Sequence, residues 1–144
     1  MENYTGLDSL TFSVTDGVLS DSATVSITVT AVNDAPVAVT AAVTTEEDRD
    51  YSGLVSAFDI DNDPLIYRLL TEPSHGTVAI TDSSAGTFTY SPKVNYNGSD
   101  SFTFTSSDGM LSDTSKVLIT VPAVNDAPIA YDLEIGTYED TEYS

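Results

Sequence analysis

Acidic side chains in this 144-residue chain gather in short stretches between apolar runs. The densest stretch is Asp59-Ile60-Asp61-Asn62-Asp63, and Glu46-Glu47-Asp48 lies shortly before it. Asn-Asp pairs occur at 33–34 and again at 125–126. Carboxylate and amide oxygens, without His or Cys, suit Ca²⁺, which takes about six to eight oxygen ligands, and they do not suit zinc. The residue types therefore indicate calcium chemistry.

Spacing alone leaves a second interpretation open. Acidic triplets also occur in ordinary solvated turns, where they keep a protein soluble. The stretch is not an EF-hand loop: counted from Asp59, the sixth residue is Pro64 and the twelfth is Leu70, where Gly and Glu are required. Two carboxylates roughly 4 Å apart repel by about 4 kcal/mol at an effective dielectric of about 20. Several acids that converge on one place therefore need a cation.

Catalytic chemistry has little support. His75 is the only histidine, and no strained serine is marked beside it. Paired carboxylates could serve a glycosidase, but these acids are expected at the ends of a module rather than in a cleft. The chain has no cysteine, which excludes disulfides, thiolate metal sites and thiol nucleophiles. We expect no enzyme activity.

The chain is built from a tandem repeat of 92 residues. The phrase Ala-Val-Asn-Asp-Ala-Pro at residues 31–36, the first joint, returns at residues 123–128, the second joint. Residues 3–36 match residues 95–128 at 22 of 34 positions. Fixed-period self-similarity indicates an array of modules. We predict that residues 1–36 end one repeat, 37–128 form a complete repeat, and 129–144 supply the first strand of another.

Apolar and polar residues alternate with a period of two, which predicts strands. Turn signals between short strands are typical of an all-β, seven-strand immunoglobulin/cadherin-like Greek-key sandwich. Tyr96 stands where such sandwiches place a corner tyrosine, although a plain core position is equally compatible. The strands are expected at residues 37–45, 52–58, 65–70, 77–80, 87–90, 100–105 and 115–121. The residues expected to point inward are Leu65, Tyr67, Leu69, Val78, Ile80, Phe88, Tyr90, Phe102, Phe104, Val117, Ile119 and Val121.

Successive loops of such a sandwich alternate between its two ends. The first joint, the loop at 59–63 and the loop carrying Asp108 and Asp113 fall at one end. The second joint falls at the other end, with the loop at 46–48 and the loop that contains Asn95, Asn97 and Asp100. Acids should therefore collect at both joints.

Four stretches resemble the cadherin-like tandem repeats of large calcium-dependent bacterial surface adhesins. They are VNDAP, EED, DIDND and NYNGSDSFTFTSSDG, and the resemblance covers essentially the whole chain. It implies calcium at each joint, held by acids from the modules on both sides. Where cadherins carry Asp-x-Glu before the sixth strand, this chain has only Asp8 or Asp100. The implied ligands are Asp8, Asn33, Asp34, Asp59, Asp61, Asp63 and Asp108 at the first joint, and Glu47, Asp48, Asp100, Asn125 and Asp126 at the second.

Charge limits the partners. With 4 Lys and Arg against 23 Asp and Glu, the net charge is −19, which disfavours nucleic acid and anionic membrane. No apolar run is long enough to insert into a membrane. The expected partners are neighbouring repeats of the same chain. The incomplete ends, residues 1–30 and 129–144, are expected to be mobile or to pair with another copy through open strand edges.

The sequence predicts a structural spacer repeat of an extracellular bacterial adhesin, stiffened by Ca²⁺ at its joints. The alternative is a carbohydrate- or protein-binding immunoglobulin-like module of a secreted or surface protein. That alternative needs an exposed aromatic platform, and Tyr131 or Tyr138 on one flat face would favour it.

Overall fold

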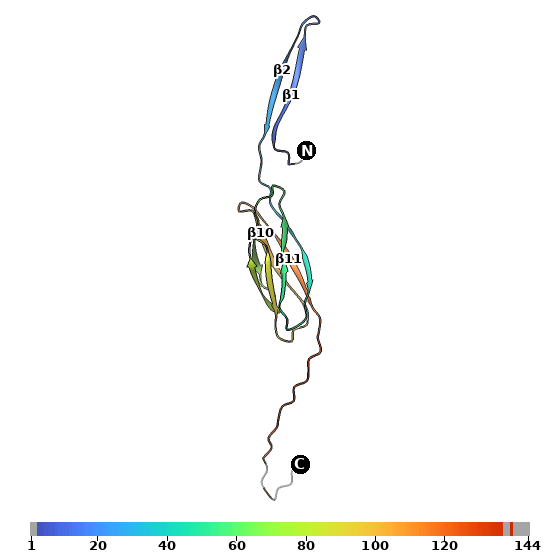
Figure 1. Cartoon of the computed structure of the whole chain (residues 1–144), viewed down its shortest axis with the longest axis vertical. Coiled ribbons are helices and arrows are strands. Elements are labelled where there is room, and N and C mark those ends of the chain that lie inside the picture. Colours follow the sequence, from blue (N-terminus) through green and yellow to red (C-terminus); the bar gives the residue numbers. More distant parts are fainter. Residues whose placement is uncertain (1–2, 137–138, 140–144) are drawn as a thin grey trace.

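The computed structural model describes residues 3–136 and 139, and every regular element in them is a β-strand. A hairpin stands at one end, a β-sandwich lies in the middle, and an extended segment leaves the sandwich at the other end (Figure 1). The strands are β1 (Gly6–Thr15), β2 (Ser20–Val29), β3 (Val37–Val39), β4 (Ala41–Thr44), β5 (Tyr51–Leu54), β6 (Ser56–Phe58), β7 (Ile66–Thr71), β8 (Gly76–Asp82), β9 (Thr87–Pro92), β10 (Gly98–Ser107) and β11 (Ser112–Val121).

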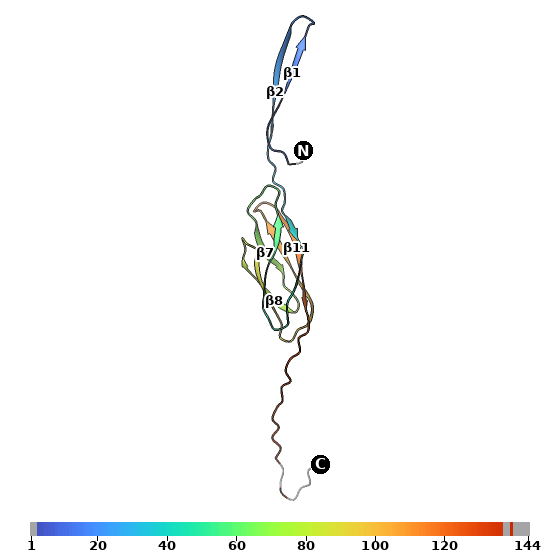
Figure 2. The same ribbon diagram turned by 45° about the vertical axis from the view of Figure 1, so that its right-hand side comes forward.

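The sandwich consists of two main sheets. One has the order β4-β11-β10-β7 and the other β5-β9-β8, while β3 and β6 form a short separate pair. Strands of both sheets are labelled in Figure 2: β7 and β11 of the first, β8 of the second. All neighbours pair antiparallel except β4 and β11, which run parallel. The all-β immunoglobulin-like class predicted from the sequence is confirmed.

The core lies between the facing sheets and follows the predicted alternation. Phe102 and Phe104 on β10 are fully buried, while Thr103 between them is only partly covered. Phe88 on β9 meets Phe102 edge to face, with ring centroids 5.1 Å apart. Every residue predicted to point inward is either buried or packed against the buried cluster. The prediction of the core is therefore confirmed.

Two predicted strands are wrong as single elements. The stretch at 37–45 divides at Thr40 into β3, which pairs with β6, and β4, which pairs with β11. The stretch at 52–58 divides at Val55, whose N–H donates to the Gly86 carbonyl at 2.9 Å. At the first break the inward positions shift by one residue, from Ala38 to Ala41 and Val43. At the second break Gly53, Val55 and Ala57 keep the alternation. Periodicity cannot show such a change of partner strand.

The hairpin β1–β2 repeats the geometry of β10–β11. Gly6 pairs with Val29 as Gly98 pairs with Val121, 92 residues later in each strand. The Tyr4 hydroxyl donates to the Leu7 carbonyl at 2.8 Å, and the Tyr96 hydroxyl donates to the Ser99 carbonyl at 2.7 Å. Tyr96 is thus a corner tyrosine as well as a partner of the core.

The same apolar pattern is buried in one hairpin and exposed in the other. Phe12 is 52% exposed, whereas Phe104, 92 residues later, is fully buried. β10 and β11 have β7, β4 and the second sheet to cover them, whereas β1 pairs with β2 alone. Two strands cannot close a core.

Residues 129–136, predicted to begin a strand, form none in this structure, and the rest of that prediction falls on residues 137, 138 and 140–144, outside the described part. An extended chain becomes a strand only when a neighbour accepts its hydrogen bonds. In the described residues, no helix is long and apolar enough to cross a membrane.

Gly86 offers a test of how tightly the turn between β8 and β9 packs against the break between β5 and β6. Its φ is +73°, and a Cβ there would lie 2.4 Å from the Val55 carbonyl oxygen. We expect Gly86→Ala to lower the free energy of unfolding by about 2–4 kcal/mol, from strain plus displacement of that backbone. Gly109→Ala is the matched control: its φ is +96°, with nothing within 4 Å, so only strain of about 1–2 kcal/mol applies. Urea unfolding would measure both, and equal losses would contradict the contact.

Candidate metal centre

Three carboxylates converge in the loop after β6. Asp59, Asp61 and Asp63, the first acidic group, each bring an oxygen within 4.8 Å of the others. Asp59 is only 5% exposed, and its Oδ1 accepts the Asp61 N–H at 2.8 Å and the Asp63 N–H at 3.4 Å. Asn62 completes the tight loop in the left-handed region, with a φ of 62°, which Asn tolerates well. The loop folds around the Asp59 side chain.

The second oxygen of Asp59 is the strongest indication that the first acidic group binds a ligand. Asp59 Oδ2 is buried and has no hydrogen-bond partner in the part of the chain that the structure describes. A buried carboxylate oxygen without a partner is costly, and two more carboxylates nearby raise the cost by repulsion. A hard cation bound to this oxygen would remove both costs. The residues of the first acidic group therefore fit calcium.

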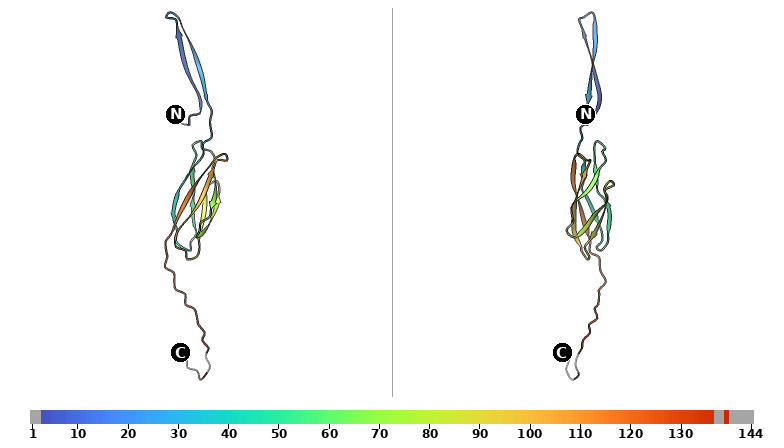
Figure 3. Two further views of the ribbon diagram at one scale, coloured as in Figure 1. Left: turned by 180° about the vertical axis from the view of Figure 1, so that it is seen from behind. Right: turned by 90° about the vertical axis from the view of Figure 1, so that its left-hand side faces the viewer.

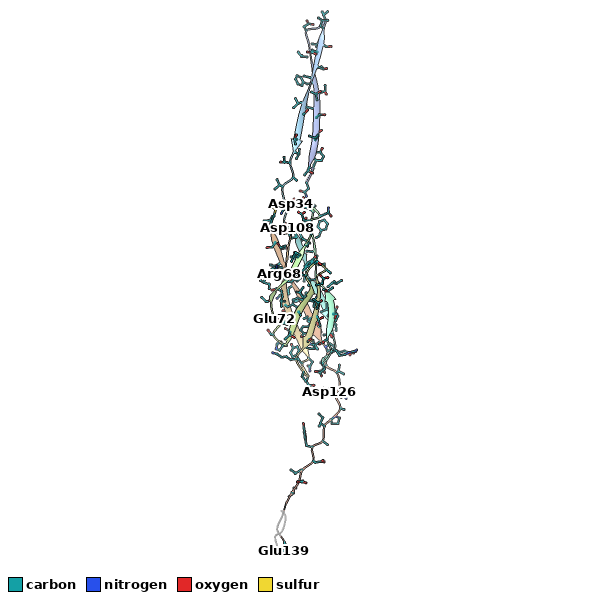
Figure 4. The ribbon with its side chains drawn as sticks, turned by 60° about the vertical axis from the view of Figure 1, so that its left-hand side comes forward. Asp34, Arg68, Glu72, Asp108, Asp126 and Glu139 are labelled. Atoms are coloured by element: carbon teal, nitrogen blue, oxygen red, sulfur yellow. The ribbon has the colours of Figure 1, made fainter. Side chains whose placement is uncertain are left out.

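The first joint is tied to the same end of the sandwich. The Asp34 N–H donates to Asp61 Oδ2 at 2.8 Å, and Asn33 Nδ2 donates to Asp108 Oδ2 at 2.8 Å. Figure 4 shows Asp34 and Asp108 together at the hairpin end. The Asn33 bond, followed by the backbone N–H groups of Leu111 and Met110, lowers the pKa of Asp108. Asp108 thus acts as a turn former that also holds the joint.

A cavity of about 460 Å³ lies between the hairpin base, the first joint and the acidic loop. Its walls carry oxygen-bearing side chains from all three parts, and an adjoining cavity of about 230 Å³ shares Asn3 and Asp61 with it. The first cavity is lined by Asn3, Thr5, Ala31, Val32, Asn33, Ile60, Asp61 and Asp63.

A second acidic group lies at the opposite end of the sandwich. Glu47, Asp48 and Asp126 each place an oxygen within 4.8 Å of the others. Glu47 is 6% exposed, and its Oε1 accepts a hydrogen bond from the Val124 N–H of the second joint. Asp48 Oδ1 accepts the Asn95 N–H at 2.8 Å. Figure 4 shows Asp126 below the sandwich, far from Asp34.

The two joints share an internal contact. Asn125 Nδ2 donates to the Asp126 carbonyl at 3.4 Å, just as Asn33 Nδ2 donates to the Asp34 carbonyl at 3.2 Å. Asn33 and Asn125 therefore shape the joints through their side-chain NH₂ groups, and each keeps a side-chain oxygen that could bind a metal. Asn33 also lines the same cavity as Asp61 and Asp63.

Asp8 and Asp100 lie outside both groups. Asp100 is buried inside the sandwich, and each of its oxygens accepts two hydrogen bonds: Oδ1 from the Ser74 and Ser101 N–H groups, Oδ2 from the His75 N–H and the Tyr90 hydroxyl. Four bonds fill the acceptor capacity of a carboxylate. Asp8 lies on the exposed hairpin and accepts the Ser9 N–H at 2.7 Å.

The environment of Asp100 changes two pKa values. Burial acts to raise the pKa of Asp100, but the N–H groups of Ser101, His75 and Ser74 and the Tyr90 hydroxyl together bring it below its ordinary value. Burial, then the bond to Asp100, raises the pKa of Tyr90 far above its usual range. Asp100 is thus a charged structural anchor of the core.

His75 takes part in the same anchor. Its ring stacks on Tyr96, with centroids 4.2 Å apart and planes 6° from parallel, and its Nδ1 is 3.9 Å from Asp100 Oδ1. Ser74 meets Asp100 through its backbone N–H. The His75 ring therefore packs against Tyr96 from the turn between β7 and β8.

Sequence reasoning missed one polar residue at the first joint. Asn3 lines both cavities there and has a φ of 59°. The signal was present in the repeat, because Asn95 stands 92 residues later with a φ of 56°.

Two facing β-sheets, with a joint at each end and an acidic group beside each joint, define an immunoglobulin-like module. The model of the family described as "Bacterial Ig domain" matches residues 33–120, more than half of the chain. The chain belongs to this family. No curated protein matches it.

Several solved structures are similar to this chain. An endo-fucoidan hydrolase, MfFcnA4 of glycoside hydrolase family 107, is 29% identical with a TM-score of 0.53, and the match covers 84% of this chain and 19% of that one. Domains EC1-2 of human protocadherin-24 are 24% identical with a TM-score of 0.49, covering 62% of this chain and 45% of that one. Domains 4 and 5 of the S-layer protein SbsC are 18% identical with a TM-score of 0.44, covering 81% and 58%. The chain spans about a fifth of the hydrolase's length.

Proposed function

We propose that this chain is a spacer segment of an extracellular bacterial surface protein, in which Ca²⁺ bound at each joint stiffens the connection between successive modules. One observation carries the proposal: the two acidic groups adjoin equivalent residues of the two joints, Asp34 through its backbone N–H and Asp126 through its carboxylate. Asp34 of the first joint donates to the first acidic group, and Asp126, 92 residues later, is a member of the second.

Because the two joints are equivalent, a joint between two complete modules has an acidic group of each kind beside it. Where a complete module lies on each side of a joint, the module before it supplies the equivalents of Glu47, Asp48 and Asp126, and the module after it supplies Asp59, Asp61 and Asp63. Six carboxylates within one joint repel strongly in the absence of metal. Calcium, bound by about six to eight oxygens, would turn that repulsion into a bridge between modules.

Each group would contribute in a different way. Asp59 would provide its unpartnered oxygen, and Asp61 and Asp63 would complete the side of the following module, with Asn33 beside them. Glu47 and Asp48 would provide the side of the preceding module, and Asn125 and Asp126 the joint itself. Calcium would supply positive charge, while the hydrogen bonds from Asp34 and Val124 hold the joint in place for it.

The setting supports an extracellular location. Calcium sites of extracellular modules have dissociation constants of about 10⁻⁴–10⁻³ M, so they fill outside cells and stay empty in the cytosol. Small secreted domains often rely on disulfides, and this chain has no cysteine, so a bound metal would take over that role.

A second candidate is a carbohydrate-binding module, favoured by the similarity to the endo-fucoidan hydrolase. It requires an aromatic platform on a rigid face. Tyr131 is 86% exposed but lies in the extended segment after the second joint rather than on a sheet, and Tyr138 lies outside the described residues. An accessory module that separates two domains of a longer enzyme would again be a spacer.

A tandem protein tests the proposal: residues 1–128 followed directly by residues 37–144, which gives one joint a complete module on each side. With calcium at about 100 times its dissociation constant, we expect the free energy of unfolding to rise by about 2.7 kcal/mol, and EDTA to reverse the change. Small-angle scattering should show a longer, narrower particle with calcium. The matched control carries Asp61→Asn and Asp63→Asn in the second copy only. Equal melting temperatures and equal dimensions with and without calcium would refute the proposal.

A further inference from the structure

We propose that residues 133–136 of one copy of this chain pair with the open edge of β2 in a second copy, so that copies assemble head to tail into a fibre. The contact joins the exposed hairpin to the extended segment after the second joint, and it does not depend on the proposed calcium sites.

The hairpin β1–β2 presents an apolar face and an open strand edge. β2 pairs with β1 along one edge, and no other strand of the described residues pairs with it. Val25 and Ile27 of β2 are exposed, whereas Val117 and Ile119, their equivalents on β11, are buried. A two-stranded hairpin is only marginally stable in water, and three strands with an apolar face are more stable. The addition of one strand to β2 would therefore stabilise the hairpin.

Residues 133–136 supply a strand with the matching pattern. They lie 92 positions after β4, which is the strand that pairs with β11 in the sandwich. Ala41 and Val43 of β4 pack against the core, and their equivalents Leu133 and Ile135 are also apolar. Both of these side chains are exposed, and residues 133–136 pair with no strand of the described part of the chain. An extended segment of this kind becomes a strand when a neighbour accepts its hydrogen bonds.

The pairing of β4 with β11 provides the register of the new pair. The two strands run parallel, and each residue of the pair has an equivalent 92 positions away in β2 or in residues 133–136. In that register the apolar side chains of both strands share one face, where they cover one another. The predicted pairs are Val25 with Leu133, Ser26 with Glu134, Ile27 with Ile135 and Thr28 with Gly136.

The direction of the two strands decides how the copies are arranged. The hairpin lies beyond one end of the sandwich and the extended segment beyond the other, so the two cannot meet within one copy (Figure 3). β2 runs toward the sandwich and the segment runs away from it, which is the same direction along the molecule. A parallel pair therefore requires two copies in the same orientation, one beyond the other, because copies in opposite orientations would pair these strands antiparallel. Such a head-to-tail contact does not close on itself and gives an open-ended fibre.

Charge opposes the contact without blocking it. Each copy has a net charge of −19, so copies repel one another at low ionic strength. Glu134, the acidic residue within the paired segment, lies opposite Ser26 in the predicted register and meets no second acid there. Salt screens the general repulsion and leaves the burial of apolar side chains in place. Assembly should therefore increase with the concentration of NaCl.

Disulfide trapping tests the register, because the chain has no cysteine of its own. Ser26→Cys and Glu134→Cys, each in a separate 144-residue chain, are mixed in EDTA and about 0.5 M NaCl and mildly oxidised. Directly opposite residues of paired strands are close enough for a disulfide, so the mixed dimer should form about tenfold faster than in the control. The matched control replaces Glu134→Cys by Asp132→Cys, two residues out of register. Equal rates would overturn the register.

Sedimentation velocity of the natural chain tests the assembly. The average mass should rise with protein and NaCl concentration beyond that of a dimer, equally with and without EDTA. Leu133→Asp places a charge on the apolar face and should weaken association about tenfold. Tyr131→Asp is the matched control, because it adds the same charge just outside the paired residues and should leave association unchanged.

The remaining outcomes would overturn the proposal. A natural chain that stays monomeric at all concentrations, or whose mass stops at that of a dimer, excludes the head-to-tail fibre. Equal association of Leu133→Asp and Tyr131→Asp excludes residues 133–136 as the added strand. Assembly that EDTA abolishes would mean that calcium, rather than strand pairing, holds the copies together.

Discussion

Replacing Asp59 by Asn is expected to weaken calcium binding at the first joint by about 100-fold, or roughly 2.8 kcal/mol, while making the metal-free protein more stable. Asp59 is the buried member of the first acidic group, and one of its oxygens has no partner in the described residues. Asn keeps the oxygen that accepts the Asp61 and Asp63 N–H groups, so the loop retains its shape. The exchange removes the charge and replaces one carboxylate oxygen by an NH₂ group.

The expected gain in stability of the metal-free variant follows from the same geometry. A buried charge beside two other carboxylates is destabilising when nothing neutralises it. Asp59→Asn removes that charge, and its new NH₂ group can donate to a neighbouring carboxylate. We expect the free energy of unfolding in EDTA to rise by about 1 kcal/mol. In saturating calcium the order should reverse, with the natural chain more stable.

Calorimetric titration and thermal melts, with EDTA and with calcium, measure both effects. Asp82→Asn is the control for the loss of one negative charge, because Asp82 shapes the turn between β8 and β9 through bonds to Ser84 and Ala85. Asp82→Asn should leave the calcium affinity unchanged. Its melting temperature relative to that of the natural chain should be the same with EDTA and with calcium. A metal-free Asp59→Asn chain less stable than the natural one would show that the carboxylate serves the fold, and unchanged calcium affinity would remove Asp59 from the site.

The second large effect is expected at Asp100. Asp100→Ala removes the acceptor for the Ser74 and His75 N–H groups and for the Tyr90 hydroxyl, all at a buried site. We expect a loss of about 3–4 kcal/mol in the free energy of unfolding. Calcium affinity at the first acidic group should stay within about twofold, because the sites are distant and share no partner.

Asp8→Ala is the matched control, since Asp8 is the residue 92 positions earlier. Its carboxylate accepts only the N–H of the adjacent Ser9 in the described residues, on an exposed hairpin. The stability change should be within about 0.5 kcal/mol. A comparable loss in the two variants, measured by urea unfolding, would contradict a special role for Asp100 in the core.

The effect of Asp100 should also depend on pH. Its pKa lies below the ordinary value of 3.8, because hydrogen bonds from backbone N–H groups and Tyr90 outweigh the effect of burial. A carboxyl group with a lowered folded-state pKa stabilises the fold above its unfolded-state pKa. Its contribution is lost as the pH falls from about 4 toward the folded-state value. The difference in stability between the natural chain and Asp100→Ala should therefore shrink with acidification through that range.

Local patterns were sufficient for the fold class and most of the core. Alternation places Phe102 and Phe104 on one side of a strand whatever the strand pairs with, because successive side chains of a strand point to opposite faces. The repeat likewise predicted that residues 1–36 are equivalent to the end of the complete module, and β1–β2 has the register of β10–β11. The change of partner strand at Thr40 and Val55 could not be predicted, because the partner of a strand comes from a distant part of the chain.

The sequence also identified which acids to consider, but not how each is used. Asp59 and Asp100 are both aspartates at the edge of an apolar run. The packing of distant segments leaves one oxygen of Asp59 without a hydrogen-bond partner in the described residues. The same packing gives Asp100 four hydrogen bonds, which use all of its acceptor positions. Composition, spacing and period are local properties, and they revealed the sandwich, the repeat and the acidic joints. The state of a single carboxylate depends on atoms brought from elsewhere in the chain, so only the folded structure could assign it.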